Sequence, residues 1–167
     1  GDEVIVFDPA YDTYVPAVTL NGAICRHIPM TYPDFRIDWQ RLRDTVNERT
    51  RLIILNTPHN PSGACLTADD SAELRDIVRK RNIFLLSDEV YEHLVFDQKP
   101  HLSILSDAEL AARSFVVFSF GKTFHATGWR VGYCVAPVAL MTEFLKIHQF
   151  INFSTNAPMQ FGLADFM

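Results

Sequence analysis

Short apolar runs that each end in polar residues alternate along this chain with segments that can form helices. The clearest runs are 52–55, 83–86 and 115–118, and the residues that follow them include Asn56, Asp88 and Ser119. Continuous apolar runs of this length are typical of strands buried on both faces of a sheet. Helical segments of about 10 to 15 residues lie between several of these strands, a pattern that indicates crossover connections. The spacing predicts an α/β domain, with a mostly parallel central sheet in a three-layer α/β/α arrangement.

The same pattern predicts the individual elements. We expect strands at 4–7, 24–28, 51–56, 83–87, 115–119 and 131–135, and helices within 11–21, 38–47, 67–81, 141–150 and from 156 onward. Asp38 and Thr67 are typical N-cap residues. Acidic residues follow Thr67, and basic residues occupy the end of that segment, an order that suits the helix dipole. The stretch 57–63, with two prolines and a glycine, is expected to be irregular.

Composition excludes several classes of protein. The 167 residues are 48 % hydrophobic and 21 % charged, with a net charge of −5 and scattered basic residues. We therefore expect neither nucleic acid nor an anionic membrane as a partner. No apolar stretch approaches the roughly 18 residues that a membrane span needs. The first residues have no features of a signal or transit peptide.

The cysteines and histidines indicate neither a disulfide framework nor a metal site. Cys25, Cys65 and Cys134 are isolated and odd in number, so we expect reduced thiols in a cytoplasmic protein. The histidines have no spacing that builds a metal site, and no metal is expected.

Polar residues beyond the strand ends are expected to meet at one rim of the sheet. In open parallel sheets, ligands bind beyond the carboxyl ends of the strands. The segments 56–60, 88–91 and 119–122 follow three of those ends. The last segment delivers Lys122, whose amine, if removed from water, becomes a nucleophile able to form a Schiff base with an aldehyde.

Each of these residues, taken alone, also has a purely structural interpretation. Asn60 is compatible with a simple turn, and Asp88 with the cap of a helix beginning at Glu89. Lys122 alone is compatible with a side chain that extends to solvent, and Arg130 with an ordinary ion pair.

The motifs in combination resemble those of fold-type I pyridoxal phosphate enzymes of the class I/II aminotransferase family. The matching segments, in order, are Asn60-Pro-Ser-Gly63, Ser87-Asp-Glu-Val-Tyr91, Ser119-Phe-Gly-Lys122 and Thr127-Gly-Trp-Arg130. Their surroundings are most similar to the branch that contains methionine and kynurenine aminotransferases. The resemblance covers essentially the whole chain.

This resemblance implies catalytic roles for Lys122, Asp88 and Tyr91, with pyridoxal 5'-phosphate as the cofactor. Lys122 would hold the cofactor as a Schiff base and then move a proton between the substrate and the cofactor. Asp88 would accept a hydrogen bond from the pyridine nitrogen and keep that nitrogen protonated. Tyr91 would donate to the phenolic oxygen, and one helical turn would bring it to the same side as Asp88.

The remaining cofactor-binding residues are also implied by the resemblance. Asn60 would donate to the phenolic oxygen beside Tyr91, and Tyr11 would stack on the pyridine ring. Ser119 and Arg130 would bind the phosphate, with the Arg130 guanidinium as a bidentate fork.

Members of the family are typically more than twice as long as this chain. The resemblance therefore implies that residues 1–167 are the central part of the large, cofactor-binding domain. The N-terminal segment and the small domain would lie outside it, and the large-domain fold would be incomplete. A homodimer is expected from the family, and the isolated fragment is not expected to be active.

The activity implied is transfer of an amino group from an amino acid to a 2-oxo acid by a ping-pong mechanism. Methionine, aromatic amino acids and kynurenine-like compounds are the expected donors. Two alternatives remain open: a cysteine-conjugate β-lyase of the same fold, and a cofactor-sensing regulator fused to a DNA-binding module.

Overall fold

A six-stranded sheet with the order β2-β1-β3-β4-β5-β6 forms the centre of the molecule, and the computed structural model describes residues 1–167. The strands are β1 (Glu3–Asp8), β2 (Ile24–Pro29), β3 (Thr50–Asn56), β4 (Phe84–Asp88), β5 (Ser114–Ser119) and β6 (Gly132–Val135). The first five are parallel to one another, and only β6 runs antiparallel, against β5. The predicted mostly parallel sheet is confirmed.

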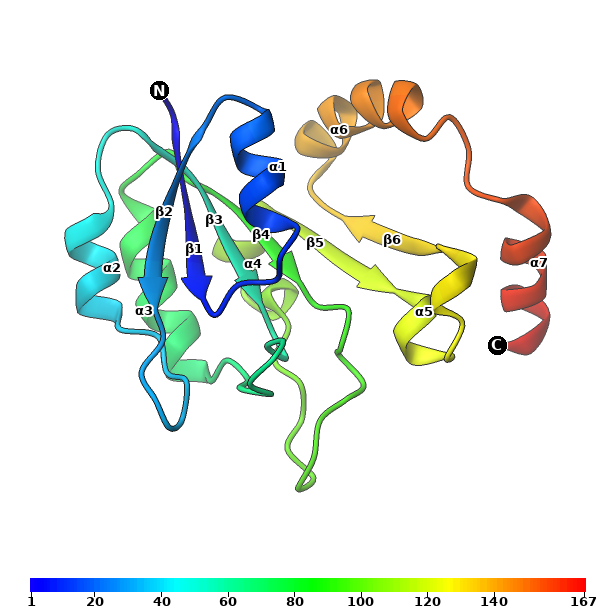
Figure 1. Ribbon diagram of the computed structural model, residues 1–167, viewed down its shortest axis with the longest axis horizontal. Coiled ribbons are helices and arrows are strands. Elements are labelled where there is room, and N and C mark those ends of the chain that lie inside the picture. Colours follow the sequence, from blue (N-terminus) through cyan, green and yellow to red (C-terminus); the bar gives the residue numbers. More distant parts are fainter.

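The connections between the strands are mainly helical (Figure 1). The helices are α1 (Tyr14–Leu20), α2 (Trp39–Thr45), α3 (Ala68–Arg79), α4 (Ala108–Ala111), α5 (Phe120–Thr123), α6 (Val138–Ile151) and α7 (Ala157–Phe166), with short 3-10 turns η1 (Ile104–Ser106) and η2 (Thr127–Trp129). None of these helices combines the length and apolarity needed to cross a bilayer.

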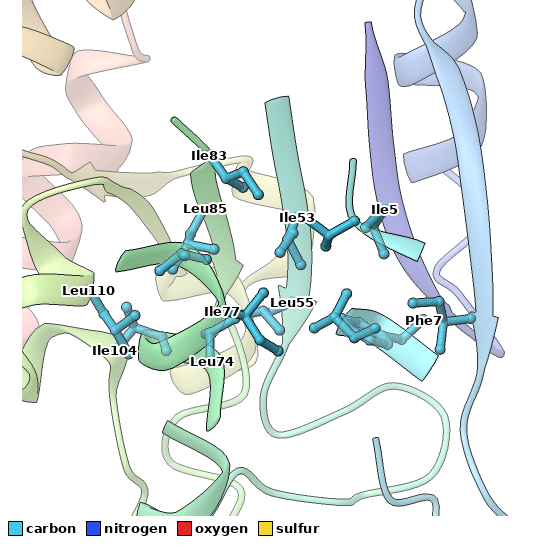
Figure 2. Packing of buried hydrophobic residues seen from close by; sticks show 14 of the residues in the cluster. Ile5, Phe7, Ile53, Leu55, Leu74, Ile77, Ile83, Leu85, Ile104 and Leu110 are labelled. Carbon is cyan, nitrogen blue, oxygen red and sulfur yellow. The ribbon is translucent and has the colours of Figure 1, made fainter. Parts of the chain in front are cut away.

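The two faces of the sheet are covered unequally. A cluster of 16 buried residues joins one face to α2, α3, η1 and α4, and Figure 2 shows its packing around Ile53, Leu55 and Leu85. On the other face, a cluster of four buried residues packs mainly against α1. The Phe144 ring of α6 contacts the Phe115 ring of β5, with centroids 6.2 Å apart. The three-layer arrangement is therefore confirmed, with one thick and one thin helical layer.

The helix starts follow the capping chemistry. Asp38 accepts a hydrogen bond from the Arg41 amide at the start of α2. Thr67 and Asp70 form a reciprocal capping box at the start of α3. Each interaction satisfies a backbone donor that the first helical turn leaves without a partner.

The chain between β5 and the C-terminus packs less tightly than the rest. Helix α6 contains no buried residue. Large apolar side chains in and after it, among them Val138, Phe150 and Phe153, are more than four-fifths exposed. The hydrophobic core consequently lies around β1, β3, β4 and β5, the strands whose carboxyl ends carry the predicted site.

Candidate active site

One cavity of about 300 Å³ brings together every residue predicted for the site. Its walls include the strand-end residues Asn56, Asp88 and Ser119. The predicted residues along its wall are Tyr11, Asn60, Asp88, Tyr91, Ser119, Lys122 and Arg130. A larger cavity of about 670 Å³ shares Tyr14 and Asn56 with it but contains neither Lys122 nor Asp88. The chemistry of the side chains, and not cavity size, points to the smaller one.

Asp88, the last residue of β4, is held from several directions. The Tyr14 hydroxyl donates to Asp88 Oδ2 at 2.5 Å, and the Val90 amide donates to Oδ1 at 3.3 Å. The Asn56 side chain donates to the Asp88 backbone carbonyl at 2.9 Å. Burial raises the pKa of Asp88 above its ordinary value, while the Tyr14 hydrogen bond and the Lys122 charge act to lower it.

No helix begins after Asp88, so both the helix-cap interpretation and the expected helical turn to Tyr91 were wrong. Residues 90–93 form a turn, in which the Glu92 amide donates to the Glu89 carbonyl. Tyr91, within this turn, still lines the same cavity as Asp88.

Lys122 lies in the short helix α5, which directly follows β5. It is partly buried, and its ammonium lies 5.5 Å from the centroid of the Tyr91 ring, within range of a cation–π interaction. Neither Lys122 nor Arg130 forms an ion pair with a carboxylate in the structure. Two cationic side chains therefore line the cavity without a neutralising partner at contact distance.

The loop that carries Asn60 is braced by its own polar side chains. The Asn60 amide donates to Asn56 Oδ1 at 2.7 Å. His59 is buried, with Nδ1 at 2.7 Å from the Ser62 hydroxyl and Nε2 at 3.0 Å from the Pro9 carbonyl. Burial lowers the pKa of His59. These contacts join the loop after β3 to the end of β1.

Tyr11, Ser119 and Arg130 complete the rim. Tyr11 is 45 % exposed and makes an edge-to-face contact with Tyr14, with ring centroids 5.6 Å apart. Arg130 is exposed, and its guanidinium donates to the Thr127 carbonyl at 3.2 Å. Its backbone is left-handed, with φ of 56°, a conformation that costs energy in a residue with a side chain.

Sequence reasoning did not assign a role to Tyr14 or to the side chain of Asn56. Both contact Asp88 and line the cavity. Asn56 was identifiable as the polar residue that ends a buried strand. Tyr14 follows Tyr11 by three residues, the spacing that places two side chains on one side of a helix.

Comparison with known proteins defines the family. The model of the aminotransferase class I and II family matches residues 1–163. The chain belongs to this family. Methionine aminotransferase of Escherichia coli is 50 % identical over 167 residues, which are all of this chain and 43 % of that protein. A probable N-succinyldiaminopimelate aminotransferase of Mycobacterium tuberculosis is 38 % identical, over 98 % of this chain and 42 % of that protein.

A further relative in sequence and a solved structure are also similar to this chain. A probable kynurenine–oxoglutarate transaminase of Saccharomyces cerevisiae is 36 % identical over 99 % of this chain and 40 % of that protein. Among solved structures, YbdL of Escherichia coli, identified with a methionine aminotransferase function, superposes with a TM-score of 0.96 at 51 % identity, covering 99 % of this chain and 44 % of that one. The chain thus spans about two fifths of the length of these relatives.

Proposed function

We propose that these residues are the central part of the large domain of a pyridoxal phosphate-dependent aminotransferase. The enzyme would move an amino group from an amino acid to a 2-oxo acid by a ping-pong mechanism. The observation that carries the proposal is the single cavity in which a lysine, a carboxylate, three tyrosines, two asparagines, a serine and an arginine meet. The names of the relatives support it, since those described above are all aminotransferases or transaminases.

The donor set fits this cofactor. The amine suits the aldehyde of the cofactor, and the carboxylate beside a phenol suits its ring nitrogen. The exposed aromatic ring suits the face of the cofactor ring, and the guanidinium without an ion-pair partner suits its phosphate. Pyridoxal phosphate, when bound, supplies a ring that withdraws electrons from the substrate carbon. The protein's part is to hold that ring and to move protons.

We assign the proton transfers to Lys122. Its amine would bind the aldehyde carbon of the cofactor with loss of water. Once displaced by the amine of the substrate, it would take the proton from the substrate Cα and deliver it to the former aldehyde carbon of the cofactor. Asp88 would keep the ring nitrogen protonated through a charge-assisted hydrogen bond. Tyr91 would donate to the ring oxygen from the turn after β4.

The other residues would fix the cofactor in place. Asn60 would donate to the same ring oxygen as Tyr91, and Tyr11 would lie against the face of the ring. Ser119 and Arg130 would bind the phosphate, and the lack of a carboxylate partner leaves the Arg130 guanidinium available for this contact.

The proposal extends to substrates and assembly. The similarity to the Escherichia coli relative supports methionine as a donor, and the similarity to kynurenine transaminases supports kynurenine or aromatic amino acids. We also propose that the full-length protein is a homodimer and lies in the cytoplasm.

A visible spectrum of the full-length protein tests this assignment. We expect pyridoxal phosphate to produce an absorption band that disappears on addition of methionine, and Lys122→Ala to lack that band. The same substitution should lower the rate of amino transfer by about 100- to 10,000-fold, the usual contribution of a positioned acid–base group. A folded protein without any Lys122-dependent band would contradict the role of Lys122.

Product analysis separates the proposed activity from its alternatives. With methionine and a 2-oxo acid, a transaminase produces a new amino acid. Formation of pyruvate and ammonia from a cysteine conjugate, without that amino acid, would instead indicate a β-lyase. A Lys122-dependent band that no amino acid changes would indicate a cofactor-sensing regulator.

A further inference from the structure

Tyr14 makes the shortest contact to the catalytic carboxylate. It lies in the first turn of α1, 74 residues before Asp88, and its hydroxyl donates to Asp88 Oδ2 at 2.5 Å. The tyrosine is partly buried and lines the cavity beside Asp88. A hydrogen bond of this length to a carboxylate is typical of a strong, charge-assisted interaction.

The two oxygens of Asp88 are in different environments. Oδ2 is occupied by the Tyr14 hydroxyl, whereas Oδ1 receives only a long bond of 3.3 Å from the Val90 amide. The Asn56 side chain fixes the backbone of the same residue through its carbonyl. Rotation of the carboxylate is therefore restricted, and Oδ1 keeps capacity for a further donor.

The charges around the pair favour a phenol that keeps its proton. Burial and the Asp88 charge raise the pKa of Tyr14 far above its usual range. The Tyr14 hydrogen bond, in turn, acts to lower the pKa of Asp88 against the effect of burial. Among the neighbours, Lys122 favours the ionised carboxylate and Glu89 opposes it. Tyr14 is thus a donor that does not titrate in the neutral range, and it stabilises the ionised form of Asp88.

We propose that Tyr14 is a positioning residue: its hydroxyl holds Asp88 ionised and leaves Oδ1 to pair with a protonated ring nitrogen. This inference rests on the proposed function, because it concerns the same cofactor. Loss of the hydroxyl makes the carboxylate a stronger base. The proton between the ring nitrogen and Asp88 then shifts toward Asp88, and the ring loses part of its positive charge.

Tyr14 also supports the ring of Tyr11 through an edge-to-face contact at an interplanar angle of 75°. Tyr14→Phe keeps this aromatic contact and removes only the hydroxyl. Tyr32→Phe is a matched control, because Tyr32 is 80 % exposed and its ring contacts Phe35, away from the cavity.

The test uses the full-length protein with pyridoxal phosphate labelled with ¹⁵N in the ring. In Tyr14→Phe we expect the ¹⁵N resonance to move toward the position of an unprotonated pyridine. Cofactor affinity, measured by equilibrium dialysis, should fall about tenfold, because Asp88 is no longer held in the orientation that leaves Oδ1 to the ring nitrogen. Tyr32→Phe should leave both readings as they are in the wild-type protein.

Other outcomes separate this inference from the proposed function. If Tyr14→Phe leaves the resonance and the affinity unchanged while Asp88→Asn alters both, Tyr14 has no positioning role and the proposed function stands. If wild-type protein binds no pyridoxal phosphate, both proposals are overturned. A second measurement, the proton NMR spectrum, does not depend on folding of the Tyr14 variant. The Tyr14 hydroxyl proton should give a downfield signal in the wild type that disappears in Asp88→Asn. Absence of that signal from the wild type would contradict the short contact.

Discussion

At the scale of single residues, Gly121 allows two backbone segments to approach closely beside Lys122. A Cβ at Gly121 would be 2.8 Å from the Thr127 Cα, closer than real Cβ atoms approach backbone. Its carbonyl accepts hydrogen bonds from the Ala126 amide at 3.0 Å and from the Thr127 hydroxyl at 3.1 Å. The loop after α5 can therefore fold back against the residue before Lys122 only because that residue has no side chain.

Gly121→Ala should force the two backbone segments apart and displace Lys122. We expect a loss of about 1 to 3 kcal/mol in the free energy of unfolding, typical of overpacking, together with a weaker Lys122-dependent absorption band. Gly128→Ala is the control, because no atom lies within 4 Å of the position of its Cβ. Denaturant unfolding of the full-length variants measures the difference, and equal stability of the two would contradict the close approach.

At the scale of elements, Glu89 joins the end of β4 to η1. Its side chain is fully buried and accepts from the Ser87 hydroxyl at 2.9 Å and the Ile104 amide at 3.0 Å. His101 Nε2 lies 2.8 Å from its second oxygen. The chain between Tyr91 and Ile104, which borders the larger cavity, is thus attached to the sheet through one carboxylate.

Glu89→Ala should release this segment, because three polar groups would lose their buried partner. We expect a cost of about 3 kcal/mol in unfolding free energy and faster hydrogen exchange within 91–104. Glu89→Gln retains one acceptor oxygen and should cost less. Glu143→Ala, an exposed substitution on α6, should change neither quantity; unaltered exchange in Glu89→Ala would disprove the attachment.

At the scale of the whole molecule, a cluster of charged residues joins neighbouring strands at the amino ends of the sheet. Glu3 begins β1 and is 1 % exposed. It accepts hydrogen bonds from Arg26 of β2 at 2.6 Å and from the Asn47 side chain at 2.8 Å, and it forms an ion pair with Arg49 at 2.7 Å. The hydrogen bond from Arg26, followed by that from Asn47, lowers the pKa of Glu3 from 4.5 to about 2. Glu3 therefore links β1 to β2 and to the segment 47–49 that precedes β3.

This cluster predicts a particular acid sensitivity. Because the pKa of Glu3 is lower in the folded state, its stabilisation is complete above about pH 4.5 and is lost as the pH falls toward about 2. Glu3→Gln should reduce the stability of the full-length protein at pH 7 and flatten its pH dependence over that window. Glu48→Gln, an exposed substitution, is the control. Parallel pH profiles for wild type and Glu3→Gln would show that the cluster contributes nothing.

Much of the fold was predictable because its signals are local. All six strands lie within two residues of their predicted ranges, and Asp38 and Thr67 cap helices as their residue types indicate. The short elements α4, α5, η1 and η2 were not predicted, since three or four residues are too few for a hydrophobic period to be visible. The turn at 90–93 was mistaken for a helical one for the same reason.

The sequence alone determined the α/β class and the set of polar residues at the strand ends. Apolar runs and caps act over a few residues, and their effect can be read without knowing the partners. Only the tertiary structure decided that Tyr14 meets Asp88, that Thr127 closes over Gly121 and that β1 lies between β2 and β3. Such contacts join residues far apart in the chain, and they depend on the order of strands in the sheet, which no local pattern records.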